Sequence, residues 1–161
     1  MIAIIRPERR ARMFADILPL KMQKNELEMF LQREFPQVSS EVEIAELTES
    51  QVTMRLITSD KHLRPGGTIS GPTMFMLADV CFYLALLSVI GPKALTVTTS
   101  AHISFMRKPS AAPLLATARR LKLGKSLAVG DVLIFSEGME APVAHASMTY
   151  AIPPATSSSV S

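Results

Sequence analysis

The chain has 161 residues, of which 48% are hydrophobic and 19% charged, with one cysteine and a net charge of +3. This length and balance fit one globular domain with its own core, and they exclude two full domains, a disulfide framework and a cysteine-rich zinc site. Few aromatic residues (6%), no tryptophan and a near-neutral charge argue against a nucleic-acid-binding surface.

The whole charge excess lies at the start of the chain. Residues 1–21 contain five basic side chains against two acidic ones, and they lack the continuous apolar stretch of a secretory signal. An arginine-rich transit-type segment and a translation start at Met22 both fit this pattern. We therefore treat 1–21 as an extension of undetermined role, 22–152 as one domain, and 153–161, which is rich in Pro and Ser, as a disordered tail.

The first predicted elements are a helix and a hairpin. Residues 26–35 place apolar side chains at helical spacing just before a proline, which predicts a short amphipathic helix that covers a sheet edge. Alternating apolar residues in 42–44 and 52–56, with the polar segment 48–51 between them, predict two antiparallel strands. The Gly- and Pro-rich segment 60–70 predicts a loop.

A long apolar helix with one carboxylate follows this loop. Of the 18 residues from Thr73 to Ile90, 15 are apolar, and Asp79 lies among them. A segment that is apolar on all sides is either a membrane span or a helix wrapped by protein. An aspartate inside only 18 residues is marginal for a span, so we expect a wrapped helix, with Cys81 as a small core residue. A carboxylate is expensive to bury there unless it is paired or used, which makes Asp79 the first functional candidate.

The remaining predicted elements are strands. Residues 95–106 alternate apolar and polar side chains, and Thr98 falls on the polar face. Three further strands are predicted over 114–123, 127–136 and 142–152, separated by short turns. These strands can cover a helix that is apolar all round only if the sheet curls around it. We therefore predict an α+β fold in which a curled antiparallel sheet of about six strands wraps one long helix.

The second half of the chain contains a run of one charge sign. Between Val80 and Gly130 there is no acidic residue. The basic residues in this stretch are Lys93, Arg107, Lys108, Arg119, Arg120, Lys122 and Lys125. Two explanations stay open: a solvated strand edge protected from aggregation by cations, or a positive field that binds a polyanionic ligand. The three histidines are scattered and form no metal-binding spacing.

Several short motifs occur in a fixed order over about residues 41–152. They are His62-Leu63-Arg64, Gly66-Gly67, Ser70-Gly71-Pro72, Leu77-Ala78-Asp79, the segment 103–109 (ISFMRKP), Gly124-Lys125-Ser126 and Met148-Thr149-Tyr150. In this order they resemble the PaaI-like acyl-CoA thioesterases of the hotdog-fold superfamily. The chain departs from that family twice, because Arg64 stands where the family has asparagine and Ser70-Gly71-Pro72 replaces its His-Gly-Gly.

The resemblance implies a hotdog fold that hydrolyses acyl-CoA thioesters, with coenzyme A as part of the substrate and no separate cofactor or metal. It implies that Asp79 is the general base or nucleophile and that the Gly71 backbone amide polarises the thioester carbonyl. A helix start suits this second role because its unpaired N–H groups stabilise developing negative charge. Thr98 matches the position at which relatives carry a hydroxyl near the carboxylate, where it would bond Asp79 or the water.

The resemblance also implies how substrate and subunits are arranged. The implied substrate-binding residues are Arg64, Ser70, Thr73, Arg107, Lys108 and Lys125. Their cations suit the anionic end of coenzyme A, and their hydroxyls cap the helix start or contact the substrate. Because Gly71 and Asp79 are eight residues apart in one helix, they can meet only across a dimer with antiparallel helices. We expect a cytoplasmic homodimer, or a tetramer, with its site at the interface and with neither a membrane nor a nucleic acid as partner.

Three alternatives stay open at this stage. A hotdog protein can bind acyl-CoA or an acyl carrier without turnover, and the two departures from the family pattern favour this reading. A hotdog hydratase or dehydratase typically uses a histidine near the helix start together with a carboxylate, and Ser70 occupies that neighbourhood here. A membrane-anchored protein would carry the apolar segment as its anchor.

Overall fold

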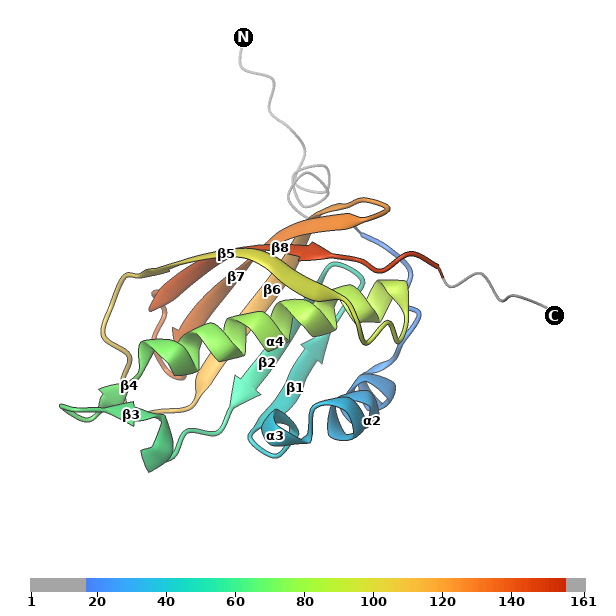
Figure 1. Ribbon diagram of the computed structural model, residues 1–161. Helices are drawn as coiled ribbons and strands as arrows, with labels where there is room; N and C mark the ends of the chain where they lie inside the picture. The colour runs from blue at the N-terminus through green and yellow to red at the C-terminus, as the bar shows by residue number, and fades with distance from the viewer. Residues whose placement is uncertain (1–16, 156–161) are drawn as a thin grey trace, which may run out of the picture.

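The structure is a computed structural model that describes residues 17–155, so most of the N-terminal extension and of the predicted tail lies outside it. A six-stranded antiparallel sheet curls around one long helix (Figure 1). In chain order the elements are α2 (Lys24–Glu34), α3 (Pro36–Ser39), β1 (Val42–Leu47), β2 (Gln51–Leu56), β3 (Leu63–Arg64), β4 (Thr68–Ile69), α4 (Gly71–Ile90), β5 (Val97–Phe105), β6 (Leu114–Leu123), β7 (Leu127–Ser136) and β8 (Ala144–Ala151). The predicted α+β fold with a wrapped helix is confirmed.

The central helix α4 is a core helix. Among the described residues it is the one helix long and apolar enough to cross a membrane, but 72% of its apolar stretch is buried inside the protein. It rests on the concave face of the sheet, mainly against β2, β6 and β7 (Figure 1). Cys81 lies fully buried in this helix, and burial raises the pKa of its thiol to about 12, so the thiol stays protonated. The predicted core role of Cys81 is confirmed.

The start of α4 lies two residues before the predicted one, for a local reason. The Ser70 hydroxyl caps the helix by accepting a hydrogen bond from the backbone N–H of Thr73 at 3.3 Å. Pro72 lacks an N–H and fits the first turn, where that donor would have no partner within the helix. Gly71 therefore becomes the first residue of the helix.

The segment 60–70, predicted as a loop, contains two short elements. A 3-10 turn covers Asp60–His62, and β3 pairs with β4 as a small hairpin. Gly66 and Gly67 close this hairpin with φ values of 96° and 76°, which other residues rarely adopt. The hairpin brings the chain back to the first residue of α4.

The sheet order β1-β2-β6-β7-β8-β5 leaves β1 and β5 as its edges. Helices α2 and α3 lie beside the β1 edge, as predicted for a helix that covers an edge (Figure 1). Pro36, expected only to end the first helix, also starts α3 after a break at Phe35. The β5 edge, in contrast, is exposed along most of its length.

The acid-free stretch does not form one basic patch. On the face of the sheet away from α4, Arg119 forms a two-pronged ion pair with Asp131 at 3.1 and 2.9 Å, and His145 contacts the same carboxylate at 3.0 Å. Burial raises the pKa of Asp131, but the hydrogen bonds from Arg119 and His145 outweigh it and lower this pKa below its usual value. Arg120 is fully buried and donates to the backbone carbonyl of Ala85 in α4 at 2.8 Å. Part of the basic run is therefore structural.

Candidate active site

Asp79 is held by two hydroxyl groups on one of its oxygens. Its Oδ1 accepts hydrogen bonds from Thr98 Oγ1 at 2.5 Å and from Tyr150 Oη at 2.6 Å. The same phenol oxygen lies 2.8 Å from the Asp79 backbone carbonyl. Within residues 17–155, no side chain or backbone group donates to Oδ2. The carboxylate thus has one fixed oxygen and one oxygen that is free to take a proton or to attack a carbonyl carbon.

Tyr150 is a site residue that the sequence interpretation left without a role. Its side chain is 2% exposed, and its pKa is raised by burial first and then by the neighbouring charge of Asp79. The phenol therefore stays protonated and keeps donating to the carboxylate. The sequence placed Tyr150 at the end of a Met-Thr-Tyr motif, but its contact with Asp79 spans 71 residues and depends on strand pairing.

A β-bulge turns Thr98 toward this carboxylate. Strand β5 pairs with β8 so that Thr98 lies opposite Tyr150, but the register shifts before Ser100, which lies opposite Thr149. Because side chains alternate along a strand, one inserted residue moves Thr98 to the face that Ala101 occupies, toward α4. The sequence had placed Thr98 on the opposite, polar face together with Ser100, and this assignment is wrong. The hydrogen bond predicted between Thr98 and Asp79 is nevertheless present.

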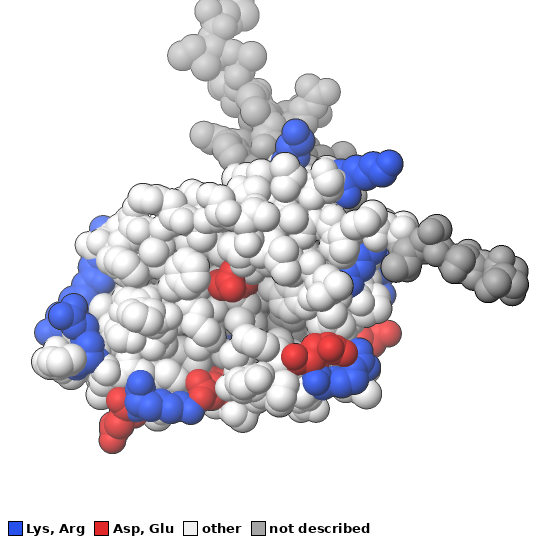
Figure 2. Space-filling view, viewed as in Figure 1, with Lys and Arg blue, Asp and Glu red and all other residues white. Residues whose placement is uncertain are grey.

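A cleft of about 510 Å³ opens beside Asp79. We call it the carboxylate cleft; its lining residues include Glu34, Phe35, Asp79, Tyr83, Leu95 and Thr98. Figure 2 shows one acidic group surrounded by a broad uncharged area, over the middle of α4, and Asp79 is the only acidic residue of that helix. The cleft is mainly apolar, and no basic residue among 17–155 lines it. Its chemistry suits an uncharged organic group.

The start of α4 presents one free amide. The Thr73 N–H is taken by the Ser70 hydroxyl, and the Met74 N–H by the Ser70 carbonyl at 3.2 Å. Pro72 has no N–H to offer. No group in the described part of the chain accepts from the Gly71 N–H. Gly71 therefore supplies a single unpaired donor at the positive end of the helix dipole.

A second cleft, of about 700 Å³, lies at this helix start. We call it the helix-start cleft; its lining residues include Arg64, Ser70, Gly71, Phe105, Arg107 and Lys108. Three of these are cations, and no acidic residue in the described part of the chain lines the cleft. Figure 2 shows basic groups gathered at the end of the molecule where the β3–β4 hairpin lies. A Cβ at Gly71 would lie only 3.1 Å from the Phe105 ring, so glycine allows this close approach. The cleft is suited to an anionic ligand.

Two other predicted binding residues lie apart from both clefts. Thr73 is buried, and its hydroxyl already contacts Ser70 Oγ at 2.8 Å. Lys125 lies in the β6–β7 turn, beside the end of β8, at the opposite end of the sheet from the helix-start cleft (Figure 1). Within one chain, Gly71 and Asp79 are about 12 Å apart along the axis of α4, at 1.5 Å per residue. One subunit therefore cannot bring both groups to the same carbonyl.

Removing the Tyr150 hydroxyl should weaken catalysis. We expect Tyr150→Phe to lower kcat about tenfold, because a hydrogen bond to a charged group contributes about 1.5–3 kcal/mol. Steady-state kinetics at neutral pH measure this effect. Thr99→Val is the control, because it removes a neighbouring β5 hydroxyl that donates to the Thr149 backbone carbonyl of β8, and it should leave kcat unchanged.

A curled antiparallel sheet around one apolar helix defines a hotdog-fold protein, here with a candidate active site in that helix. Residues 66–143 match the profile of the thioesterase superfamily. A presumed thioesterase from Silicibacter sp. TM1040 is 54% identical, with the match covering 86% of this chain and 97% of the other at a TM-score of 0.81. The chain therefore belongs to the thioesterase superfamily.

More distant structures share the fold. Zebra fish thioesterase superfamily member 2 is 21% identical, with a TM-score of 0.74 over 83% of this chain and 100% of its own. A thioesterase from Haemophilus influenzae is 16% identical, with a TM-score of 0.77 over 89% of this chain and 99% of its own. The search among curated proteins found no match. Family membership supports hydrolysis of acyl thioesters as the general activity.

Proposed function

We propose that this protein is a PaaI-like acyl-CoA thioesterase whose reacting group is Asp79. The observation that carries this proposal is the asymmetric binding of the carboxylate, with Oδ1 held by two hydroxyls and Oδ2 open to an apolar cleft. In the base route, Oδ2 takes a proton from water as the water oxygen bonds to the thioester carbon. The C–S bond then breaks, and the leaving thiolate takes the proton, which yields a carboxylic acid and free coenzyme A. In the other route Oδ2 attacks the carbonyl carbon, the C–S bond breaks, and the departing thiolate leaves a mixed anhydride on Asp79. Water then hydrolyses this anhydride to the carboxylic acid and the free Asp79 carboxylate, and the proton released goes to the coenzyme A thiolate.

The oxyanion that forms in either route needs a donor, and we assign it to Gly71 of a second subunit. Gly71 of the same chain is too far along α4 to reach it. Apolar side chains are exposed at the start of the β5 edge and just before it, beside the carboxylate cleft, with Leu95 76% and Val97 51% exposed. In a two-fold symmetric dimer with antiparallel α4 helices, the second subunit would cover this edge. Each Gly71 would then lie beside the Asp79 of the other chain. The catalytic unit in this proposal is a homodimer with two shared sites.

The charges of the two clefts set the direction of the substrate. Of the described charged residues, Glu34 and Asp79 line the carboxylate cleft and no cation does, so this cleft repels phosphates and accepts an uncharged acyl group. The described lining of the helix-start cleft contains Arg64, Arg107 and Lys108 and no acid, so this cleft attracts the phosphates of coenzyme A. We therefore propose that coenzyme A lies along the helix start of one subunit and that the acyl chain enters the carboxylate cleft of its partner.

The shared site predicts that two inactive variants restore each other. Gly71→Pro removes the amide N–H, and we expect kcat to fall by about 10²–10³, as for other lost oxyanion donors. Asp79→Asn removes the reacting oxygen from the other half of the site. Co-expressed as differently tagged chains, the two variants should form heterodimers with one intact site, and about a quarter of the wild-type activity should return under random pairing. The readout is release of free thiol from a panel of aliphatic, aromatic and dicarboxylic acyl-CoAs.

Gly71→Ala is the matched control for the proline variant, because it adds the same Cβ beside Phe105 but keeps the N–H. It should retain most of the activity. No recovery in isolated heterodimers would contradict a site shared between subunits. Wild-type protein that binds an acyl-CoA of the panel without releasing thiol would instead identify a binding protein, and the hydrolase proposal would be wrong.

A further inference from the structure

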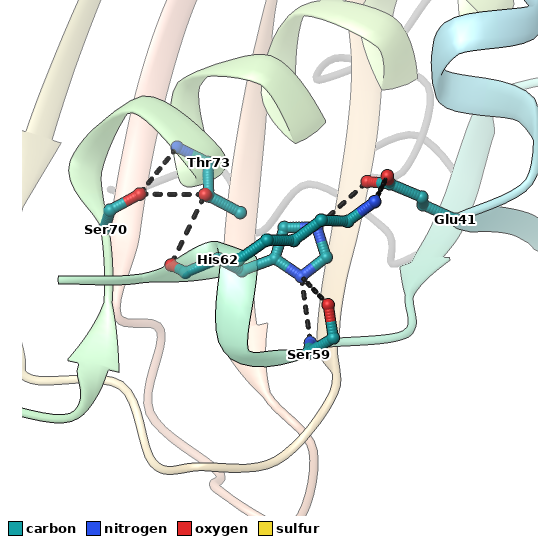
Figure 3. Close-up of polar contacts among 6 residues, drawn as sticks. Glu41, Ser59, His62, Ser70 and Thr73 are labelled. Carbon is teal, nitrogen blue, oxygen red and sulfur yellow. Dashed lines mark hydrogen bonds and ion pairs between the residues drawn. The ribbon is translucent and has the colours of Figure 1, made fainter.

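A polar network joins the residue before β1 to the start of α4 (Figure 3), and its members Glu41 and His62 lie outside both clefts. Glu41, the residue before β1, receives a hydrogen bond from the His62 ring at 2.9 Å on one oxygen and is contacted by Lys61 on the other. The His62 side chain is 6% exposed and that of Glu41 18%. Hydrogen bonds from Lys61 and then from His62 lower the pKa of Glu41, so it is charged at neutral pH.

Both nitrogens of the His62 ring are occupied. Nδ1 lies 2.9 Å from the backbone nitrogen of Ser59, whose N–H can only donate, so Nδ1 is the unprotonated acceptor. Nε2 therefore carries the hydrogen and donates it to Glu41. Hydrogen bonds at both nitrogens fix the ring in place between Ser59 and Glu41. The His62 side chain therefore anchors this segment of the chain.

The backbone of the same residue holds the helix start. The His62 carbonyl accepts from the Ser70 N–H at 2.8 Å, and the Thr73 hydroxyl lies 3.5 Å from the same oxygen (Figure 3). Ser70 in turn caps α4 and directly precedes Gly71. From 57 to 70 the chain is largely exposed, and His62 and Ile69 are its only buried residues. The position of the helix start therefore depends on how firmly His62 is held.

We propose that the Glu41–His62 pair positions the Gly71 amide, which makes Glu41 and His62 positioning residues for the reaction. The inference rests on the proposed function, in which this amide is the donor to the oxyanion. A donor in such a site must lie within a few tenths of an ångström of its working position, because a displacement of about 1 Å costs up to 10²-fold in rate. The pair fixes this position from the start of β1, and neither Glu41 nor His62 lines either cleft.

The test compares three substitutions in the full-length protein. Glu41→Leu removes the acceptor for the His62 N–H, and we expect kcat to fall about tenfold while KM changes less than about twofold. Glu41→Gln keeps an acceptor oxygen and should restore kcat to within about twofold of wild type. Lys61→Met removes only the exposed partner of Glu41 and should behave like wild type.

Amide hydrogen exchange gives a readout that does not need the enzyme activity. In Glu41→Leu the Ser70 and Thr73 amides should exchange faster, while the Gly91 amide at the far end of α4 should be unchanged. His62→Leu repeats the test with an apolar residue that suits a buried site, should Glu41→Leu fail to fold. Unchanged exchange at Ser70, or equal losses of kcat in the Leu and Gln variants, would overturn the positioning role. The amides can exchange faster in Glu41→Leu while the wild-type protein releases no thiol from any acyl-CoA. That result would support the positioning of the amide and reject only the proposed function.

Discussion

The Asp79→Asn variant is expected to lose about 10³-fold in kcat while its KM stays within about threefold of wild type. Asparagine has the same shape and can still accept from Thr98 and Tyr150 through its carbonyl oxygen. The group that replaces the free Oδ2 is an amide nitrogen, which neither takes a proton from water nor attacks a carbonyl. Thiol release measures turnover, and calorimetry with a non-hydrolysable thioether analogue of the best acyl-CoA measures binding.

Asp131→Asn is the matched control for this variant. It neutralises a partly buried carboxylate on the other face of the sheet, where Arg119 and His145 hold it. Its turnover should equal that of wild type at neutral pH, although its stability can fall. If Asp79→Asn kept more than about a tenth of the wild-type kcat, Asp79 would be neither base nor nucleophile. Loss of binding together with turnover would indicate a structural role instead.

Gly130→Ala should be among the most destabilising single substitutions in the sheet. A Cβ at this position of β7 would lie 2.1 Å from the Phe82 ring and 2.2 Å from the Arg119 backbone carbonyl. Neither distance is physically possible, and the core around Phe82 is fully buried, so the strand or the helix must move. We expect the free energy of unfolding to fall by about 3 kcal/mol or more, measured by urea denaturation monitored by circular dichroism.

A second substitution separates the two clashes. In Gly130→Ala combined with Phe82→Leu, the shorter side chain removes the contact with the ring, but the contact with the Arg119 carbonyl stays. The double variant should therefore lose less free energy of unfolding than the two single variants lose together. It should still be less stable than wild type. Strict additivity would mean that the Phe82 ring does not cause the loss. A loss below about 1 kcal/mol in Gly130→Ala would contradict the close approach of α4 and β7.

Sequence reasoning located most elements because their signals are local. The strands over 114–123 and 127–136 were predicted with the bounds that the structure has, since alternation and flanking turns are visible within ten residues. The β3–β4 hairpin was missed because a hairpin of two residues per strand has no periodicity. The bulge between Thr98 and Ser100 was missed because it exists only relative to the partner strand β8.

The candidate site was predictable in its residue types but not in its arrangement. Asp79 stood out because one carboxylate in an apolar helix is unusual, and Arg64, Arg107 and Lys108 were named as cations before the structure placed them in one cleft. Lys125 had the same signal and lies at the other end of the sheet. Charge in a sequence indicates a preference for anions, but only the fold determines which cations share a surface.

The amino-acid sequence by itself determined that one apolar helix is wrapped by a sheet and that this helix carries a single acid. These features follow from the burial pattern, which is visible within a few neighbouring residues. Only the tertiary structure decided which oxygen of Asp79 is free, that the Gly71 amide has no partner among the described residues, and that Glu41 holds the His62 ring in place. Those outcomes depend on hydrogen bonds between residues up to 71 positions apart, and the directions of such bonds exist only after the strands have paired.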